Sequence, residues 1–408
     1  RRMKILTITL LTLALPSASC KGQEPKSVDD PALVAAVDSL MPQLEKLSGL
    51  KKLKPITMKP QSREDLRKYV ATRLHEEMPV DELKGITAAY AALGLVPDTI
   101  DLEKVLLDLY AEQVAGYYDP KTDAFYMVEG TPRELLRPTL AHELVHALQD
   151  QHADLDSLIS RKRGNDRQTA AQAAIEGHAT LVMFAILADP SGNFDVSMLP
   201  DMSAQLRPVM EAQNSQFPVF QAAPRIIRET MLFPYVSGAG FVQQLWRAQR
   251  NSGDRFGAPL GSRLPQSTEQ VMHPLTAYLA TRDHPTELQF SQNAPGRLIY
   301  ENTLGELEIS ILLAEHTGNS AAAAGWDGDR YRVVDVAGKA VLFWQTVWDD
   351  AAAADRFAAA YRSVARKRPG RAIHVQRNAV GQMSGVWIVD APAGVDVARF
   401  APAQIQIR

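Results

Sequence analysis

The sequence predicts an α+β protein that is mainly α, with a large helical domain followed by a small α+β domain. Three observations predict this class. Apolar side chains recur at helical spacing over most of residues 31–320, a short aromatic stretch at 116–128 breaks that spacing, and residues 321–408 contain runs that alternate with a period of two. A chain of 408 residues has room for two domains, because a single core rarely grows past about 250–300 residues.

The N-terminal segment "RRMKILTITLLTLALPSASCKG" has the order of a secretory signal: a basic start, an apolar run over 5–15, and small residues before Cys20. We therefore predict a signal peptide over 1–20. Cys20 stands where a bacterial lipoprotein carries its lipid, although Ser17 replaces the usual leucine. Plain cleavage between Ser19 and Cys20 is the alternative.

Cys20 is the only cysteine, so no intramolecular disulfide can form and stability has to come from the core or from a bound metal. The predicted location is the bacterial cell envelope, membrane-anchored through lipidated Cys20 on the periplasmic or outer-membrane side. A net charge of −3 and a pI near 6.4 leave no basic surplus for nucleic acid. We therefore expect no nucleic-acid partner.

Helices are expected through much of the first 320 residues. A polar tether and an N-terminal helix occupy 21–60, the main domain 61–320 and the C-terminal domain 321–408. Within the first part, the apolar spacing and the Ser62 and Gly94 end signals predict helices over 31–50, 62–78, 81–93 and 101–116.

Turn residues in "GYYDPKTDAFYMVEG" predict a hairpin over 116–128. A helix then begins at Thr131-Pro132 or Arg137-Pro138. The remaining predictions for the main domain are a charged loop (160–169), an apolar buried helix (170–188), a loop-rich stretch (189–225), helices over 226–249 with a break near Phe233-Pro234, and a short helix beginning at Ser267 or Thr268.

The C-terminal domain is predicted as a β-β-α-β-β block. Its strands are expected at 331–336, 340–347, 372–377 and 384–389, with a helix over 349–367. Trp326, Trp344 and Trp348 are interpreted as core residues of this block.

The stretch "LAHELVHALQDQH" contains H-E-x-x-H at His142, Glu143 and His146. On a helix, positions i and i+4 share a face, so both imidazoles can bind one Zn²⁺ while Glu143 lies beside them as a general base. A zinc-bound water ionises near neutral pH, which suits hydrolysis of a peptide bond. A chance match is the alternative.

A third protein ligand is needed, and His152 and Glu176 are the candidates. His152 has metzincin spacing, but Gln149 stands where a turning glycine would be required, and a straight helix carries His152 about 9 Å along its axis from His146. Glu176 lies on the next helix in an apolar segment, where a buried carboxylate needs a cation or a hydrogen-bond partner. Gly177 would allow close helix packing there.

Five segments, "EQVAGYYDPKTDAFYMV", "LAHELVHALQDQH", "AAIEGHATLVMF", "FPYVSGAGFVQQLW" and "PQSTEQVMHP", together resemble a poorly characterised group of prokaryotic zincin-type metallopeptidases, gluzincin-like in layout. The resemblance covers roughly residues 105–275, with a weaker match at "GWDGDRY". It implies a zincin-like catalytic domain, His142, His146 and Glu176 as zinc ligands, and Glu143 as base. It implies no substrate, and the gap between His146 and Glu176 is longer than in thermolysin-like enzymes.

Two further features of such enzymes can be sought here. The strand Phe125–Val128 is expected to be the edge that holds a peptide substrate by β-addition, unless the hairpin is only structural. Tyr235 and His273 are the candidate donors to the developing oxyanion, unless His273 merely pairs with Glu269. His178 is interpreted either as a support for a ligand or as a core histidine. The predicted function is an exported zinc metallopeptidase acting on a peptide or protein; the alternative is a non-enzymatic envelope protein, a chaperone or interaction module, with a structural zinc site.

Overall fold

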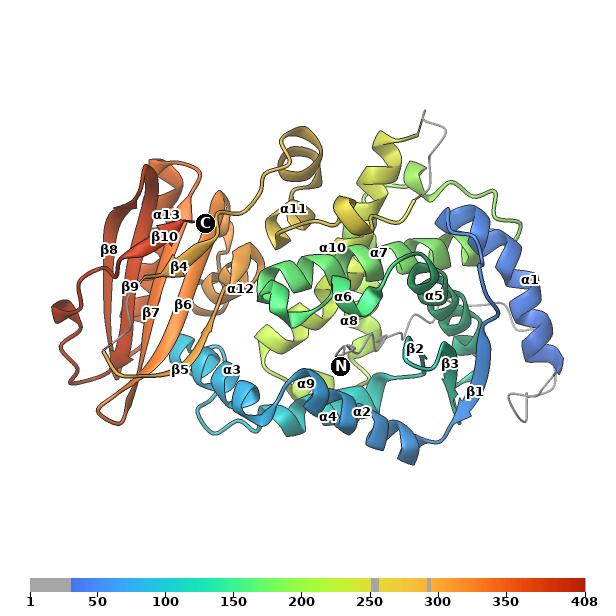
Figure 1. Ribbon diagram of the computed structural model, residues 1–408, viewed down its shortest axis with the longest axis horizontal. Helices are drawn as coiled ribbons and strands as arrows, with labels where there is room; N and C mark the ends of the chain where they lie inside the picture. The colour runs from blue at the N-terminus through green and yellow to red at the C-terminus, as the bar shows by residue number, and fades with distance from the viewer. Residues whose placement is uncertain (1–30, 251–256, 292–294, 408) are drawn as a thin grey trace.

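The computed structural model describes residues 31–250, 257–291 and 295–407; the predicted signal peptide, Cys20 and most of the tether lie outside them. With 55% of residues helical and 18% in strands, the mainly α, α+β class is confirmed. Figure 1 shows a helical part and, at its left, a sheet built from the C-terminal third of the chain.

The first helices follow the predicted pattern closely. Ser62 accepts a hydrogen bond from the backbone N–H of Asp65 and so caps its helix, and Gly94 ends the next helix in the left-handed conformation at φ 72°. The helices of this region are α1 (Pro31–Ser48), α2 (Arg63–Glu77), α3 (Val80–Leu93) and α4 (Leu102–Gln113).

A small three-stranded sheet precedes the helix with the H-E-x-x-H motif. The predicted hairpin is confirmed as β2 (Gly116–Asp119) and β3 (Ala124–Val128), and a strand that was not predicted, β1 (Thr57–Gln61), joins it in the order β1-β3-β2. The expectation that Phe125–Val128 forms a free edge is wrong, because β1 pairs with β3 in parallel on the side away from β2. The motif helix, α5 (Arg133–His152), begins after Pro132.

Two long helices, α7 (Asn165–Ala188) and α10 (Arg225–Ala248), cross at two glycines. A Cβ built on Gly177 would lie 2.6 Å from the backbone nitrogen of Ala239 and closer still to the carbonyl group of Gly238. A Cβ on Gly238 would overlap the carbonyl group of Ala173 in the same way. The close packing predicted for Gly177 is therefore confirmed. At the crossing the two helices touch through backbone atoms, because glycine has no side chain to hold them apart.

Three predictions in this region are wrong. The charged segment 160–169 is not one loop, since α7 already begins at Asn165 after the short helices α6 (Leu155–Leu158) and η1 (Arg161–Arg163). The predicted helix break at Phe233-Pro234 does not occur. Helix α10 continues through Pro234, where tertiary packing outweighs the lost backbone hydrogen bond. The loop-rich stretch contains η2 (Val196–Met198), α8 (Met202–Asn214) and α9 (Pro218–Ala222).

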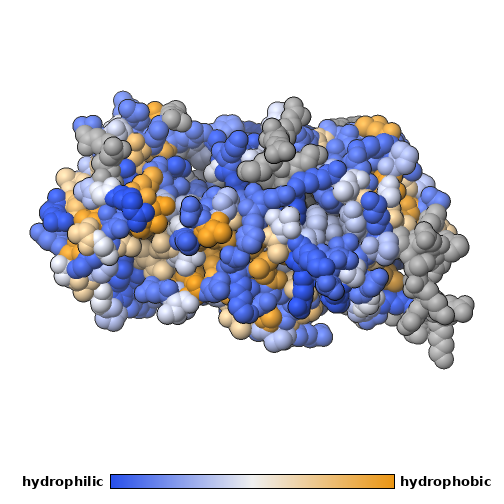
Figure 2. Space-filling view, turned by 60° about the horizontal axis from the view of Figure 1, so that its bottom comes forward, coloured by the Kyte–Doolittle hydropathy of each residue, from blue (hydrophilic) through white to orange (hydrophobic). Residues whose placement is uncertain are grey.

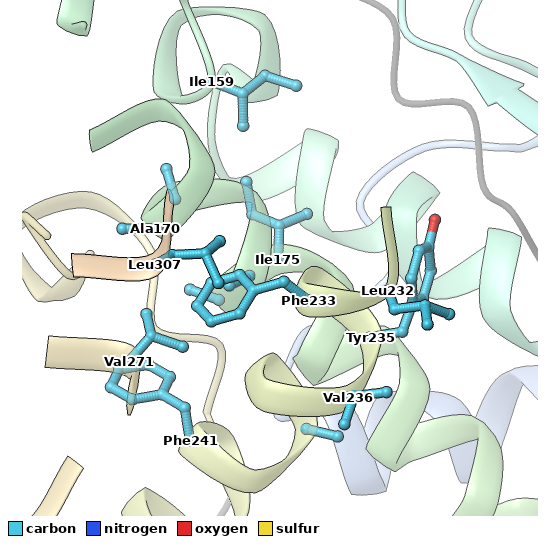
Figure 3. Packing of buried hydrophobic residues seen from close by; sticks show 14 of the residues in the cluster. Ile159, Ala170, Ile175, Leu232, Phe233, Tyr235, Val236, Phe241, Val271 and Leu307 are labelled. Carbon is cyan, nitrogen blue, oxygen red and sulfur yellow. The ribbon is translucent and has the colours of Figure 1, made fainter. Parts of the chain in front are cut away.

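The main core forms around the crossing of α7 and α10. Figure 3 shows apolar side chains from both helices packing together with Val271 and Leu307 from neighbouring elements. By length and composition α7 is the one helix of the described residues that could cross a membrane, but 83% of its most apolar window is buried inside the molecule. The face visible in Figure 2 is mostly hydrophilic, with apolar residues in small scattered groups. The prediction that the helix over 170–188, observed as α7, is a buried core element is confirmed.

The C-terminal part is a five-stranded antiparallel sheet in the order β5-β6-β7-β9-β8, with α13 packed against it. The predicted β-β-α-β-β block is confirmed as β6 (Trp326–Val336), β7 (Lys339–Trp348), α13 (Ala351–Arg366), β8 (Arg371–Val380) and β9 (Met383–Pro392). Strand β5 (Arg297–Asn302) enters the same sheet from before residue 321. The remaining elements are η3 (Gly261–Arg263), α11 (Thr268–Met272), η4 (Pro274–Ala280), β4 (Leu288–Phe290), α12 (Gly305–Thr317), η5 (Ala321–Ala323), η6 (Val397–Arg399) and β10 (Ile405–Ile407).

The weakly matched segment "GWDGDRY" has a structural role. The buried Asp329 carboxylate accepts hydrogen bonds from the backbone N–H groups of Leu304 and Gly305, at the start of α12, and from the indoles of Trp326 and Trp344. One side chain thus ties the start of a helix to two strands of the sheet. Trp326, Trp344 and Trp348 are each at most 1% exposed, as predicted for core residues.

The start of α7 is joined to α11 by another buried carboxylate, and this contact predicts a dependence of stability on pH. Asp166 accepts from both the backbone N–H and the hydroxyl of Thr268, yet burial raises the pKa of Asp166 to about 7. The unfolded pKa is about 3.9, so between about pH 4 and 7 the folded state keeps a proton that the unfolded chain has released. The contribution of Asp166 is therefore greatest below pH 4 and is lost as pH rises toward 7.

We expect Asp166→Asn to remove this slope. Urea unfolding at pH 5 and pH 7 measures this. The free energy of unfolding of the variant should rise relative to that of wild type as the pH rises, because each pH unit within the window lowers the stability of wild type by up to about 1.4 kcal/mol. Asp38→Asn, at an exposed position on α1, is the control and should track wild type. Parallel pH profiles for Asp166→Asn and wild type would contradict the expectation.

Candidate metal centre

Helices α5 and α7 bring His142, His146 and Glu176 together in the interior. The His142 Nε2 atom lies 3.0 Å from His146 Nε2 and 3.0 Å from Glu176 Oε2, and His146 Nε2 lies 3.2 Å from the same oxygen. The two histidines are fully buried and Glu176 is 6% exposed. The three predicted ligands therefore present one donor atom each to a common point.

The spacing of these atoms fits a zinc ion. Tetrahedral zinc with bonds of about 2.0–2.1 Å holds its ligand atoms about 3.3–3.4 Å apart, close to the observed 3.0–3.2 Å. Two imidazole nitrogens and one carboxylate oxygen are also the donor set of catalytic zinc sites that keep a fourth position for water or substrate. The residues present fit the metal that the sequence predicts.

A chain of hydrogen bonds fixes which nitrogen of His146 carries the hydrogen. His178 Nε2 lies 3.1 Å from the carbonyl oxygen of Ser48, which can only accept, so His178 donates there and its neutral ring accepts at Nδ1 from the Gln149 amide. The same amide donates to the carbonyl of Ile175, which leaves Gln149 Oε1 to accept from His146 Nδ1 at 2.8 Å. His146 Nε2 is thereby left with its lone pair toward the metal position.

Gln149 and Ser48 were missed as functional residues from the sequence. Gln149 stands where a metzincin has its turning glycine, yet its position three residues after His146, on the same helix face, is a signal that identifies it as a possible partner of that histidine. Ser48 offers a backbone carbonyl, which no side-chain pattern reports. Of the two roles expected for His178, the structure favours support of a predicted ligand: it lies in the hydrogen-bond chain to His146, where burial lowers the pKa of His178 to about 3 and keeps the ring neutral.

The charges in the trio are strongly coupled. Burial lowers the pKa of His142 to about 4; it acts the same way on His146, but Glu176 outweighs it and raises the pKa of His146 to about 9. Burial alone would raise the pKa of Glu176, whereas the two imidazoles lower it to about 2. Near neutral pH these shifts favour a protonated His146 beside an ionised Glu176, with the His142 ring neutral. A metal competes with that proton, so its affinity falls as pH falls.

Glu143 lies beside the trio and is held by the small sheet. Its Oε2 atom accepts a 2.8 Å hydrogen bond from the backbone N–H of Tyr118, on the side of β2 that faces away from β3. Glu143 is fully buried, and its charge contributes to the raised pKa of His146. The hairpin that precedes α5 therefore positions the predicted base through backbone, which the sequence did not reveal.

The other candidate residues have different environments. His152 is exposed at the end of α5, where its Nε2 atom lies 2.8 Å from the carbonyl oxygen of Lys51, and it is not part of the His142–His146–Glu176 group. Tyr235 is buried, with its ring centre 6.1 Å from that of His142, and its hydroxyl points away from the apolar cluster in Figure 3. His273 pairs with Glu306 at 2.8 Å rather than with Glu269. Of the two predicted oxyanion donors, Tyr235 is the one next to a ligand.

A cavity of about 230 Å³ reaches the trio from one side. Glu176 and Tyr235 form part of its wall, and Glu176 is also the one ligand with any exposed surface. Its other walls combine apolar and polar side chains, among them Leu106, Tyr110, Ile175, Met231 and Gln172. Solvent and small groups can therefore approach the donor atoms from the α4 and α10 side.

The hydrogen-bond chain predicts a loss of metal affinity in Gln149→Leu. Leucine has a similar size but neither accepts from His146 nor donates to His178, and the loss of such supporting contacts typically weakens metal binding by about 10–100-fold. Competition with a fluorescent zinc chelator would measure the effect. Gln151→Leu on the same helix, which removes hydrogen bonds to 53–54 instead, is the control. Equal zinc affinity in the Gln149 variant and wild type would contradict this role.

Comparisons with known proteins reach one part of the chain. Residues 296–400, about a quarter of the sequence, match a family model described as a domain of unknown function, DUF8575. The match runs from β5 to η6 and leaves out the metal centre. No curated protein and no solved structure matches the chain.

Proposed function

We propose that this protein is a zinc-dependent peptide hydrolase. The observation that carries the proposal is the convergence of His142, His146 and Glu176 on one point, with a second acidic side chain, Glu143, held beside them. A purely structural zinc site needs ligands and no base. The burial of an additional carboxylate next to the trio favours catalysis over the alternative of a non-enzymatic protein with a structural metal.

Each residue has a distinct task in this proposal. His142, His146 and Glu176 hold the ion, which when bound supplies a Lewis acid that acidifies water and polarises the scissile carbonyl. The Glu143 carboxylate takes the proton of the attacking water and delivers it to the leaving amine. The hydrogen bond from Tyr118 keeps that carboxylate in place. The Tyr235 hydroxyl is the proposed donor to the developing negative charge on the carbonyl oxygen.

The substrate approaches through the cavity at Glu176 and Tyr235. At about 230 Å³ it is smaller than the pockets of about 300–1,000 Å³ that enclose whole small molecules. A cavity of this volume can hold one side chain and its peptide group, while the rest of a polypeptide substrate stays outside it. The apolar residues Ile227 and Met231 in its wall favour an apolar side chain at this position. Export and a lipid anchor at Cys20 remain predictions from the sequence.

The experiment compares metal-free protein with protein reconstituted with one equivalent of zinc, both incubated with a peptide library. Mass spectrometry of the products identifies the bonds that are cut. We expect cleavage with zinc, none after chelation, and recovery on adding zinc back. Fully zinc-loaded protein that cuts no member of a broad library would remove the support for the proposal and favour a structural metal site.

A further inference from the structure

A second cluster of acidic side chains lies away from the metal centre, where the helical part meets the C-terminal sheet. Carboxylate oxygens of Glu269, Asp283 and Asp349 lie within 4.8 Å of one another. Glu269 comes from α11, Asp283 follows η4, and Asp349 follows the last residue of β7. Segments far apart in the sequence thus bring three negative charges to one place.

Within the described residues, the negative charge of this cluster is not balanced by lysine or arginine side chains. Glu306 and Asp327 lie close enough to act electrostatically on Glu269, in addition to the two aspartates of the cluster. Among the described residues, no lysine or arginine forms an ion pair with any of these five carboxylates, and His273, paired with Glu306, is the one basic partner. Like charges held this close need a cation or protons.

Two of the buried carboxylates also have oxygens that accept no hydrogen bond from the described residues. Glu269 is 5% exposed, and no donor to its carboxylate is found in the part of the chain that the structure describes. Glu306 is 2% exposed; its Oε1 atom is bonded to His273, whereas its Oε2 atom has no partner among the same residues. A buried, unpaired carboxylate costs several kcal/mol unless it is protonated or binds a cation.

The backbone around the cluster is held in place without any ion. The side chain of Gln270, next to Glu269, donates to the carbonyl oxygen of Asp283, and the Asp283 N–H donates to the carbonyl of Ala277 at 2.7 Å. The Asp349 N–H donates to the carbonyl of Gly325 at 3.0 Å. The acidic side chains therefore converge because their backbone positions are fixed by other contacts.

We propose that Glu269, Asp283 and Asp349 form a calcium site that fastens the C-terminal sheet to the helical part of the protein. An all-oxygen, mostly carboxylate donor set is what a hard cation prefers, and it lacks the nitrogen or sulfur ligands typical of zinc. Donors that differ in exposure, from buried Glu269 to exposed Asp349, leave room for water in the six to eight positions that calcium fills. Magnesium demands stricter octahedral geometry.

The location gives this ion a structural effect. Helix α11 packs against α7, which carries Glu176, and against α12, while Asp349 directly follows strand β7 of the sheet. A cation bound by both sides adds a link across the boundary between the two parts, and ions that bind only the folded state raise its stability. The site is independent of the zinc centre and does not rest on the proposed peptidase activity.

Terbium luminescence tests the site directly, because Tb³⁺ substitutes for Ca²⁺ and emits when nearby tryptophan is excited. Trp326 and Trp348 pair across β6 and β7, and Asp327 and Asp349 follow them in the sequence. We expect full-length, zinc-loaded protein to give tryptophan-sensitised emission that Ca²⁺ displaces and the same concentration of Mg²⁺ does not. Absence of this emission, or displacement by Mg²⁺ as readily as by Ca²⁺, would overturn the calcium assignment.

Substitutions test whether the ion binds at this cluster or at another acidic part of the surface. Asp349→Asn, at an exposed position, and Glu269→Gln should each lose the emission, whereas Asp38→Asn should keep it. Calcium at a hundredfold excess over its Kd should raise the Tm of wild type by about 3 °C and leave Asp349→Asn unchanged. Undiminished terbium emission or an equal Tm shift in folded Asp349→Asn would show that the ion binds elsewhere.

Discussion

A chain carrying Glu143→Gln is expected to keep its zinc and to lose peptide hydrolysis by about 10²–10⁴-fold, the usual contribution of a general base. Glutamine has the shape of glutamate, and its carbonyl oxygen can still accept the hydrogen bond from Tyr118. It cannot take a proton from water. Binding of metal and catalysis should therefore separate in this variant, because the three ligands are untouched.

Two measurements are needed on the same samples: zinc content, and the rate of cleavage of a peptide identified in the library. Glu134→Gln, in the exposed first turn of the same helix, is the matched control and should retain wild-type rates. Wild-type turnover by zinc-loaded Glu143→Gln would rule out Glu143 as the base. Loss of zinc from that variant would instead show that Glu143 supports the ligand set.

Gly177→Ala is expected to have the largest effect on stability. The added methyl group would meet the backbone of Gly238 and Ala239, which belongs to α10 and cannot rotate away as a side chain can. Inserting one methyl group into a packed core typically costs about 1–3 kcal/mol, and a contact with the backbone of α10 places this variant at or above the top of that range. Because Glu176 is the adjacent residue, zinc affinity should fall with stability.

Chemical unfolding of the metal-free variant and wild type measures the first effect, and zinc competition the second. Gly240→Ala on α10 is the control, since its Cβ would lie 3.0 Å from the Ser203 side chain rather than against backbone. We expect that variant to change the free energy of unfolding by less than about 1 kcal/mol, as alanine also favours helix. Similar losses in the two variants would mean that the helix crossing tolerates a side chain at Gly177.

Much of the fold could be predicted because its signals are local. Ser62, Gly94 and Ser267 mark helix ends through contacts within a few residues of the chain, and the strands between Trp326 and Pro392 are rich in β-branched and aromatic residues. The errors arose where distant parts of the chain decide the outcome. Strand β1 pairs with β3 across more than sixty residues, and α10 passes through Pro234 because its neighbours hold it.

In the metal centre, too, local signals could be predicted and contacts between distant parts of the chain could not. The identity of His142, Glu143 and His146 follows from one helix face, and Glu176 from a carboxylate placed in an apolar segment, so these residues could be selected from the sequence. The contacts that orient them could not be predicted, because they use backbone groups of Ser48, Ile175 and Tyr118. Every residue has a backbone carbonyl, so the sequence does not indicate which backbone groups make these contacts.

The carbonyl of Ser48 belongs to the last residue of α1, so the metal centre is assembled from the beginning of the described chain as well as its middle. A molecule in which α1 is truncated or has not docked would still contain all four metal-site side chains, yet His178 would lose the acceptor that sets the direction of every hydrogen bond up to His146. Tight zinc binding would then mark only molecules whose N-terminal helix has docked. The proposed metal-dependent chemistry would then begin only once α1 has docked.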